Sequence, residues 1–348
     1  MKKLFLLLVM CFSLTACSLV TLERQIYPIC MSVDQLDSGE YLLALQAPRA
    51  SNSEPAEYDI ISASGATLQD ALHILSASTP YPLNFSQIRL CIIGQKIASD
   101  APLRPLLRVL MEQPTMRPTA CVSIAMGSAM DVLKNQKPDF GNRLSTHLNL
   151  LFERMQQEHL LPESTLAWCV RELSDDRCDL LISLCAVNEE NKQSSDKSGQ
   201  KEEASPAVAL GEPWSEELLP RDIIAGNIDH SSPNPVEFLG AACISRGKMV
   251  GVLTADETQL CLQLADDAKR KVAVAGDRMQ LQFLLKKDSP LSQDAGRILQ
   301  LMQKLQSLQS DPLLFGGVCA MQFSTNDAWR AFDFHSRYPD AEVVVKVK

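Results

Sequence analysis

Few residues of this 348-residue chain have the types and spacing that chemistry needs. The chain has no nucleophile elbow, phosphate-binding loop, dinucleotide-binding loop or zinc-protease helix motif. Carboxylate pairs such as those at 175–176, 202–203 and 266–267 are adjacent in sequence, which is typical of solvated faces rather than of an acid/base pair. No two histidines stand at metal-ligand spacing; the five are His73, His147, His159, His230 and His335. The sequence therefore predicts no catalytic residue, no cofactor and no metal.

One loop keeps a weaker alternative open. Asp222, Asp229 and His230 lie close together there and could hold a cation, although loop acids without fixed spacing are common. An enzyme would need several titratable groups that converge in one pocket. We therefore rank a lipid-anchored enzyme below the readings without catalysis.

Cys17 is the residue whose surroundings do specify a reaction. The chain begins with Lys2 and Lys3, continues with a nearly unbroken apolar run over 4–14, and reaches the cysteine through Leu-Thr-Ala. The run is too short for a bilayer core of about 30 Å, which needs about 20 helical residues. A basic start, a short apolar run and small residues before a cut site are typical of a secretory signal.

The ending Leu-x-Ala-Cys resembles a bacterial lipobox, in which the cysteine carries a lipid and becomes the new N-terminus. A thiolate suits that role because it is a soft nucleophile. We therefore predict a signal peptide over residues 1–16 and lipid attachment at Cys17. A plain cleaved signal is the alternative.

The charge of the chain limits its partners. The formal net charge is −9, and it becomes −11 when Lys2 and Lys3 leave with the signal. Nucleic acid binding needs clustered Lys and Arg, so an acidic chain is not expected to bind it. Electrostatic adhesion to anionic lipid is disfavoured for the same reason. No later stretch approaches about 18 consecutive apolar residues, so membrane contact is expected through the lipid alone.

Cysteine usage is unusual for an exported protein. Apart from Cys11 in the signal and Cys17, nine cysteines remain, an odd number without a Cys-x-x-Cys pair. Most of them stand inside apolar runs, where a cysteine behaves as a small buried hydrophobic residue. We therefore expect mostly reduced thiols in the core and neither a zinc ribbon nor a redox motif.

Residues 17–187 are predicted to form one domain in which strands and helices alternate. Apolar runs separated by the turn at 34–39 indicate a hairpin of 26–33 and 41–46, followed by a loop over 47–57. Helical periodicity then predicts helices that start at Thr67 and that cover 103–111, 128–134, 143–159 and 165–173. Buried strands are predicted at 87–94, 119–126 and 180–187.

Residues 188–235 are predicted to be a disordered or irregular linker, because the stretch over 188–204 is polar and charged. A second α+β domain is expected over 236–348. Its predicted strands are 238–244, 249–253, 271–274, 279–285, 313–323 and 341–347, and its predicted helices are 254–264 and 289–309. The fold class expected is thus α+β and multi-domain, with mixed sheets and helices packed on them.

Several stretches, in order, resemble one family. Residues 65–72 read Gly-Ala-Thr-Leu-Gln-Asp-Ala-Leu, and 84–98 continue with Asn-Phe-Ser-Gln and the apolar strand to Gly94. Residues 111–133, 240–258 and the ending from Trp329 to Val343 complete the set. Together they are similar to the Ger(x)C family of spore germination lipoproteins. The chain departs from that pattern at Gln87, where the family often has His, and at Val252, where it often has Trp. The part after Leu264 is shorter than the usual last domain of the family.

The resemblance implies the C subunit of a nutrient germinant receptor, a non-enzymatic and lipid-anchored subunit. It would lie on the outer face of the inner spore membrane or cell membrane. Its expected partners are an integral membrane subunit and a membrane-associated subunit, with no nucleic acid. As a hypothesis, faces of residues 240–264 dock those subunits. The alternative is a substrate-binding lipoprotein of a transporter, which would need two similar lobes, and the chain shows no internal repeat.

Overall fold

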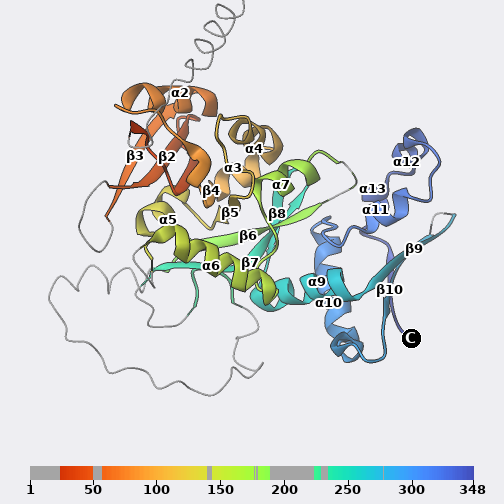
Figure 1. Cartoon of the computed structure of the whole chain (residues 1–348). Helices are drawn as coiled ribbons and strands as arrows, with labels where there is room; N and C mark the ends of the chain where they lie inside the picture. Colours follow the sequence, from red (N-terminus) through yellow and green to blue (C-terminus); the bar gives the residue numbers. More distant parts are fainter. Residues whose placement is uncertain are drawn as a thin grey trace, which may run out of the picture.

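The computed structural model describes residues 24–49, 57–138, 143–175, 177, 179–188, 223–228, 234–276 and 278–348. These residues form two β-sheets with helices packed against them (Figure 1). The larger sheet has the order β3-β2-β1-β4-β5-β6-β7-β8, and the smaller has the order β11-β10-β9. The predicted α+β class with mixed sheets is confirmed.

The strands of the larger sheet are β1 (Cys30–Gln35), β2 (Tyr41–Pro48), β3 (Tyr58–Gly65), β4 (Leu90–Gly94), β5 (Cys121–Ala125), β6 (Leu180–Val187), β7 (Val236–Ser245) and β8 (Lys248–Leu253). The central strands β1, β4, β5 and β6 run parallel, whereas β2 with β3 and β7 with β8 form antiparallel edges. Every residue of β4 and β5 is buried, as expected for parallel strands covered on both faces.

Six helices and one 3-10 turn accompany the larger sheet in the described residues. They are α2 (Leu68–Ser78), η2 (Phe85–Gln87), α3 (Gln95–Asp100), α4 (Leu103–Met111), α5 (Ala129–Asn135), α6 (Leu144–Gln157) and α7 (Leu166–Glu172). The helix α2 packs on β2 and β3, and α5 lies against β1 and β4.

The smaller sheet consists of β9 (Lys269–Ala275), β10 (Arg278–Leu285) and β11 (Glu342–Val347). Figure 1 shows it at the end of the molecule opposite to β2 and β3. Between and before its strands lie α9 (Ala255–Asp267), η3 (Pro290–Gln293), α10 (Ala295–Ser307), α11 (Phe315–Ala320), α12 (Asn326–Phe332) and α13 (Phe334–Arg337).

Two helix starts follow from local sequence alone. Thr67 accepts a hydrogen bond from the backbone N–H of Asp70, whose carboxylate accepts one from the N–H of Thr67. Thr254 and Glu257 form the same reciprocal pair at the start of α9. Each pair satisfies two of the backbone donors that a helix start leaves free. Both predicted starts are confirmed.

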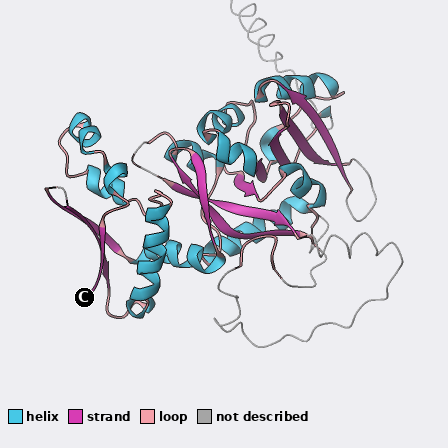
Figure 2. Cartoon of the chain, turned by 180° about the vertical axis from the view of Figure 1, so that it is seen from behind, coloured by secondary structure: helices cyan, strands magenta, loops and turns pink. Residues whose placement is uncertain are grey.

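Two hydrophobic cores share the strands β6 and β7. We call the larger sheet with helices α2 to α7 the larger unit, and the smaller sheet with helices α9 to α13 the smaller unit. Along β6, Leu181 belongs to the core of the smaller unit and Ile182 to the core of the larger one. Along β7, Cys243 and Ala242 divide in the same way. Because successive side chains of a strand point to opposite faces, one pair of strands can serve both cores. Figure 2 shows these strands between the helices of the two units.

This arrangement bears on the predicted domain limits. The predicted C-terminal domain begins at residue 236, yet β7 pairs with β6 over seven residue pairs and completes the larger sheet. The separate smaller sheet begins only at Lys269. The proposed limit at 236 thus falls between two paired strands, which sequence patterns cannot reveal because pairing depends on distant residues.

Three predicted elements differ in the structure. The stretch predicted as a strand at 313–323 contains the helix α11 instead, because Leu314 adopts a left-handed φ of +60° and buries Phe315 and Cys319 on one helical face. The single helix predicted over 289–309 is divided at Asp294 into η3 and α10. The strand β3 covers residues 58–65, where the sequence predicts no strand. Its weak alternation is stabilised by pairing with β2.

Replacement of Gly240 is expected to lower the stability of the fold. It has a φ of +81°, and a Cβ built there would lie 2.6 Å from the carbonyl oxygen of Leu253 on β8. Gly240→Ala should therefore lower the free energy of unfolding by at least about 2 kcal/mol, through backbone strain and a clash with the paired strand. Urea unfolding measures this. Gly39→Ala is the control, because Gly39 has a φ of +88° but open space around it. Equal losses of stability at both positions would show that backbone strain, and not the clash with Leu253, causes the effect.

The described cysteines are buried and free. There are eight of them, and Cys178 lies outside the described residues. Burial raises the pKa of the thiols, for example to about 12 in Cys91 and Cys243. The prediction that the cysteines lie in the core is confirmed for these eight, and their reduced state stays a prediction. Within the described ranges, no helix combines the length and the apolar character that crossing a bilayer requires.

Candidate functional site at the junction of the two units

The residues that the sequence proposes for lipid attachment and for cation binding are not among those that the structure describes. Cys17 lies outside the described residues, as do Asp222, Asp229 and His230. His73 is exposed on α2, whereas His147 is buried in α6. In the part of the chain that the structure describes, no three His, Cys, Asp or Glu side chains are grouped so that they could hold a metal ion.

The main buried polar contact between the two units is built on Asp179, which stands directly before β6. One carboxylate oxygen accepts a hydrogen bond from the backbone N–H of Arg246, at 3.3 Å, in the turn between β7 and β8. The other accepts one from the backbone N–H of Asp311, at 2.8 Å, after α10. Nearby, the hydroxyl of Ser245 donates to the carbonyl of Gln309 at 2.7 Å. Asp179 thus fastens the larger sheet to the smaller unit.

Asp311 is the second buried acid of this junction. Its Oδ2 accepts a hydrogen bond from the backbone N–H of Gly316 at 2.6 Å, at the start of α11. Its Oδ1 is buried and has no hydrogen-bond partner among the described residues. Burial, with a smaller contribution from the charge of Asp179, raises the pKa of Asp311 to about 8. Burial also raises the pKa of Asp179, although the N–H groups of Asp311 and Arg246 oppose this.

Two acids at this spacing could suggest acid/base chemistry, but their surroundings favour a structural role. Asp311 is 2% exposed and Asp179 is 4% exposed, so a substrate has no access to either carboxyl. The neighbouring Tyr338 is buried as well, and burial raises the pKa of its hydroxyl. We therefore interpret the pair as a lock that holds the two units in one arrangement. Its sequence signal was only an Asp directly before a largely apolar strand.

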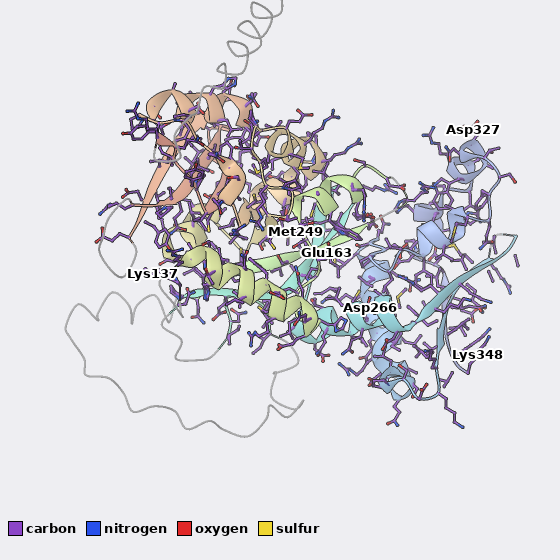
Figure 3. The ribbon with its side chains drawn as sticks, viewed as in Figure 1. Lys137, Glu163, Met249, Asp266, Asp327 and Lys348 are labelled. Atoms are coloured by element: carbon purple, nitrogen blue, oxygen red, sulfur yellow. The ribbon has the colours of Figure 1, made fainter. Side chains whose placement is uncertain are left out.

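A second contact joins the units at the surface. Nε2 of His159, just after α6, lies 2.9 Å from Oδ2 of Asp266 near the end of α9. Figure 3 places Asp266 where α9 leads into β9. His159 has a positive φ of +56°, which lets the chain turn sharply after the helix.

The surface beside the junction has a shallow hollow of about 290 Å³ between α7 and α12. Arg171, Arg177 and Arg330 line it. Asp175 pairs with Arg177 at 2.7 Å, and Glu172 pairs with Arg171 at 2.8 Å. The carboxylates therefore compensate most of the positive charge, and the hollow offers little attraction to a free anion.

Comparison with known proteins assigns the N-terminal half of the chain to a protein family. Residues 19–187 match the family of the spore germination protein N-terminal domain. Over this range, just under half of its length, the chain belongs to the Ger(x)C family of spore germination proteins. The matched range ends with β6, the strand that begins beside Asp179.

Two further similarities accompany the family match. The chain is 28% identical over 142 residues to the protein named "Putative spore germination protein YfkR" of Bacillus subtilis (strain 168). That alignment covers 38% of this chain and spans 37% of the length of the relative. Among solved structures, the crystal structure of the GerBC protein is similar over 91% of this chain and 95% of the other, with 13% identity and a TM-score of 0.46.

Proposed function

We propose that this Ger(x)C family member acts as the C subunit of a nutrient germinant receptor. In this role it is a non-enzymatic, lipid-anchored protein whose surfaces bind membrane-bound receptor subunits. The family match over residues 19–187 carries the proposal. The sequence Leu-Thr-Ala-Cys at 14–17 supports lipid anchoring at the outer face of the inner spore membrane or cell membrane.

Within residues 240–264, many side chains are buried or paired inside the protein, so only a few positions are suitable for testing partner binding. All of β7 is buried, so this strand cannot meet a partner. On α9, Asp256 pairs with Arg297 and Glu257 pairs with Lys304 of α10. Reversing those charges would break contacts inside the protein. Within residues 240–264, the exposed large apolar side chain is that of Val250 on the edge strand β8, which is 39% exposed.

Val250→Glu is therefore the variant expected to reduce co-purification of the other receptor subunits, by roughly tenfold or more for a charge placed in an apolar contact. The measurement is the amount of each subunit recovered with the tagged chain from spore membranes. Leu299→Glu on α10 is the matched control, because Leu299 is 38% exposed and lies outside residues 240–264. Unchanged recovery with Val250→Glu, or equal loss in both variants, would contradict docking through β8.

The transporter alternative receives no support from the described residues. A substrate-binding lipoprotein needs two similar lobes, and the two units here contain sheets of eight and three strands. A large thermal shift with an amino acid or a sugar would still favour that alternative over the receptor subunit.

A further inference from the structure

The smaller sheet has one face turned away from the core, and its strand register defines that face. Along β10, Met279, Leu281, Phe283 and Leu285 are buried, so the residues between them point outward. The register places Lys271 beside Gln282, and Lys346 beside Leu284. Lys269 also stands beside Leu284, and Arg278 beside Ala275. We call the outward side of β9, β10 and β11 the cationic face.

The local charge of this face is positive, whereas the net charge of the whole chain is negative. Residues 269–287 and 342–348 contain eight of the 33 Lys and Arg residues, but only two of the 42 acids, Asp277 and Glu342. The alternation of the strands brings four of those cations to the outward side. The remaining lysines, Lys286, Lys287 and Lys348, are exposed at the end of the same sheet.

The positive charge of the face is largely uncompensated within the described residues. Nζ of Lys346 donates to the neutral amide oxygen of Gln282 at 3.2 Å. The carboxylate of Glu342 accepts from the amide of Gln280 at 3.0 Å rather than from a lysine. Lys269 and Lys271 form no described ion pair within 4 Å, and their nearest acids in sequence, Asp266 and Asp267, end α9. Asp266 already contacts His159.

The shape and composition of the face indicate what it binds. Outward residues repeat about every 7 Å along a strand and about 4.8 Å between strands, so the charges form a regularly spaced array. The array contains no aromatic side chain, and interfaces between folded proteins usually have such anchors. Flexible lysines act as point charges and do not impose the fixed geometry of arginine. An extended polymer with closely spaced carboxylates matches these properties.

The position of the face favours a partner away from the anchored end. The described chain begins at Arg24, beside β1 in the larger unit. Figures 1 and 2 show the smaller sheet at the other end of the molecule. If the lipid holds the amino end at the membrane, as in the proposed function, the cationic face lies in the part of the molecule remote from the anchor. A bacterial membrane is faced on that side by its wall.

We propose that the cationic face binds the carboxylates of peptidoglycan. This rests on the proposed location of the protein for its biological setting, but the binding itself is a property of the purified chain. A contact with the wall would fix the orientation of the smaller unit relative to the anchored larger unit, through the Asp179 and Asp311 lock.

Co-sedimentation of the purified chain with peptidoglycan sacculi tests the proposal. We expect binding at about 50 mM NaCl and its loss at about 500 mM, because salt screens exposed charges. Amidation of the sacculus carboxyl groups should abolish binding. The double variant Lys271→Glu with Lys346→Glu should bind at least about tenfold more weakly. Both side chains are exposed on strand surfaces, and circular dichroism checks that the variant folds.

The control is Lys134→Glu with Lys137→Glu, which changes the net charge equally on an exposed surface. Figure 3 shows Lys137 far from Lys348. Equal loss in both double variants would overturn the assignment to this face. Binding to phosphatidylglycerol vesicles or to poly-glutamate without binding to sacculi would overturn the choice of polymer. Release of a Cys17→Ser chain from membranes tests the anchor separately, so failure of one idea is distinguishable from failure of the other.

Discussion

A chain carrying Cys17→Ser is expected to leave the membrane fraction almost completely, and spores that contain only this variant are expected to germinate as slowly as spores without the protein. A hydroxyl cannot replace the thiolate as the acceptor of the lipid. Without the lipid, an acidic chain gains little from an anionic membrane surface. Fractionation of spore membranes and the loss of optical density on nutrient addition are the measurements.

Cys11→Ser is the matched control for this variant. Cys11 lies within the predicted signal peptide and is expected to leave with it. Its replacement should therefore leave both membrane retention and germination unchanged. If the Cys17→Ser chain remains in the membrane and germination is normal, the lipid anchor proposed for this family member is wrong.

The second large effect is expected at Asp311, through the pH dependence of stability. The pKa of this carboxyl rises from its ordinary 3.8 to about 8 in the folded chain, mainly because the group is buried. Between these values the folded chain holds a proton that the unfolded chain has released. The free energy of unfolding therefore falls as the pH rises through this window, by up to about 6 kcal/mol. Above about pH 8 this contribution no longer changes.

Asp311→Asn imitates the protonated carboxyl and should remove most of that pH dependence. The groups around it, Asp179, Tyr338 and Arg270, stay in place in the variant. We expect the variant to match the parent below about pH 4, where the carboxyl is protonated in both the folded and the unfolded chain, and to exceed it increasingly up to about pH 8, in urea unfolding followed across pH. Asp340→Asn, at an exposed acid, should keep the slope of the parent. Parallel profiles for the parent and Asp311→Asn would show that another group titrates.

Elements with local causes could be predicted from the sequence. Thr67 with Asp70, and Thr254 with Glu257, specify helix starts within four residues of chain. The turn at 34–39 defined the hairpin of β1 and β2. By contrast, the apolar run at 313–323 fitted either a strand or a helix, and the left-handed backbone at Leu314 decided for the helix. Short apolar runs carry no periodicity strong enough to separate these outcomes.

The net charge of the chain also gave an incomplete expectation, in this case about binding to anions. A value of −9 describes an average, and an average predicts no attraction to anions. Strand register then placed Lys271 and Lys346 on one outward face, so the local sign differs from the total. Charge effects act over about 10 Å at moderate salt, which makes the local arrangement decisive.

By itself the sequence indicated the family, the mixed strand and helix content and the burial of the cysteines, and the lipid anchor at Cys17 stays a prediction. These depend on neighbouring residues and on the periodicity of side chains. The tertiary structure decided which strands pair across residue 236, how Asp179 meets Asp311 across 132 positions, and where the lysines gather. Those features arise from contacts between distant parts of the chain, and the spacing of residues along a sequence does not encode which distant parts come together.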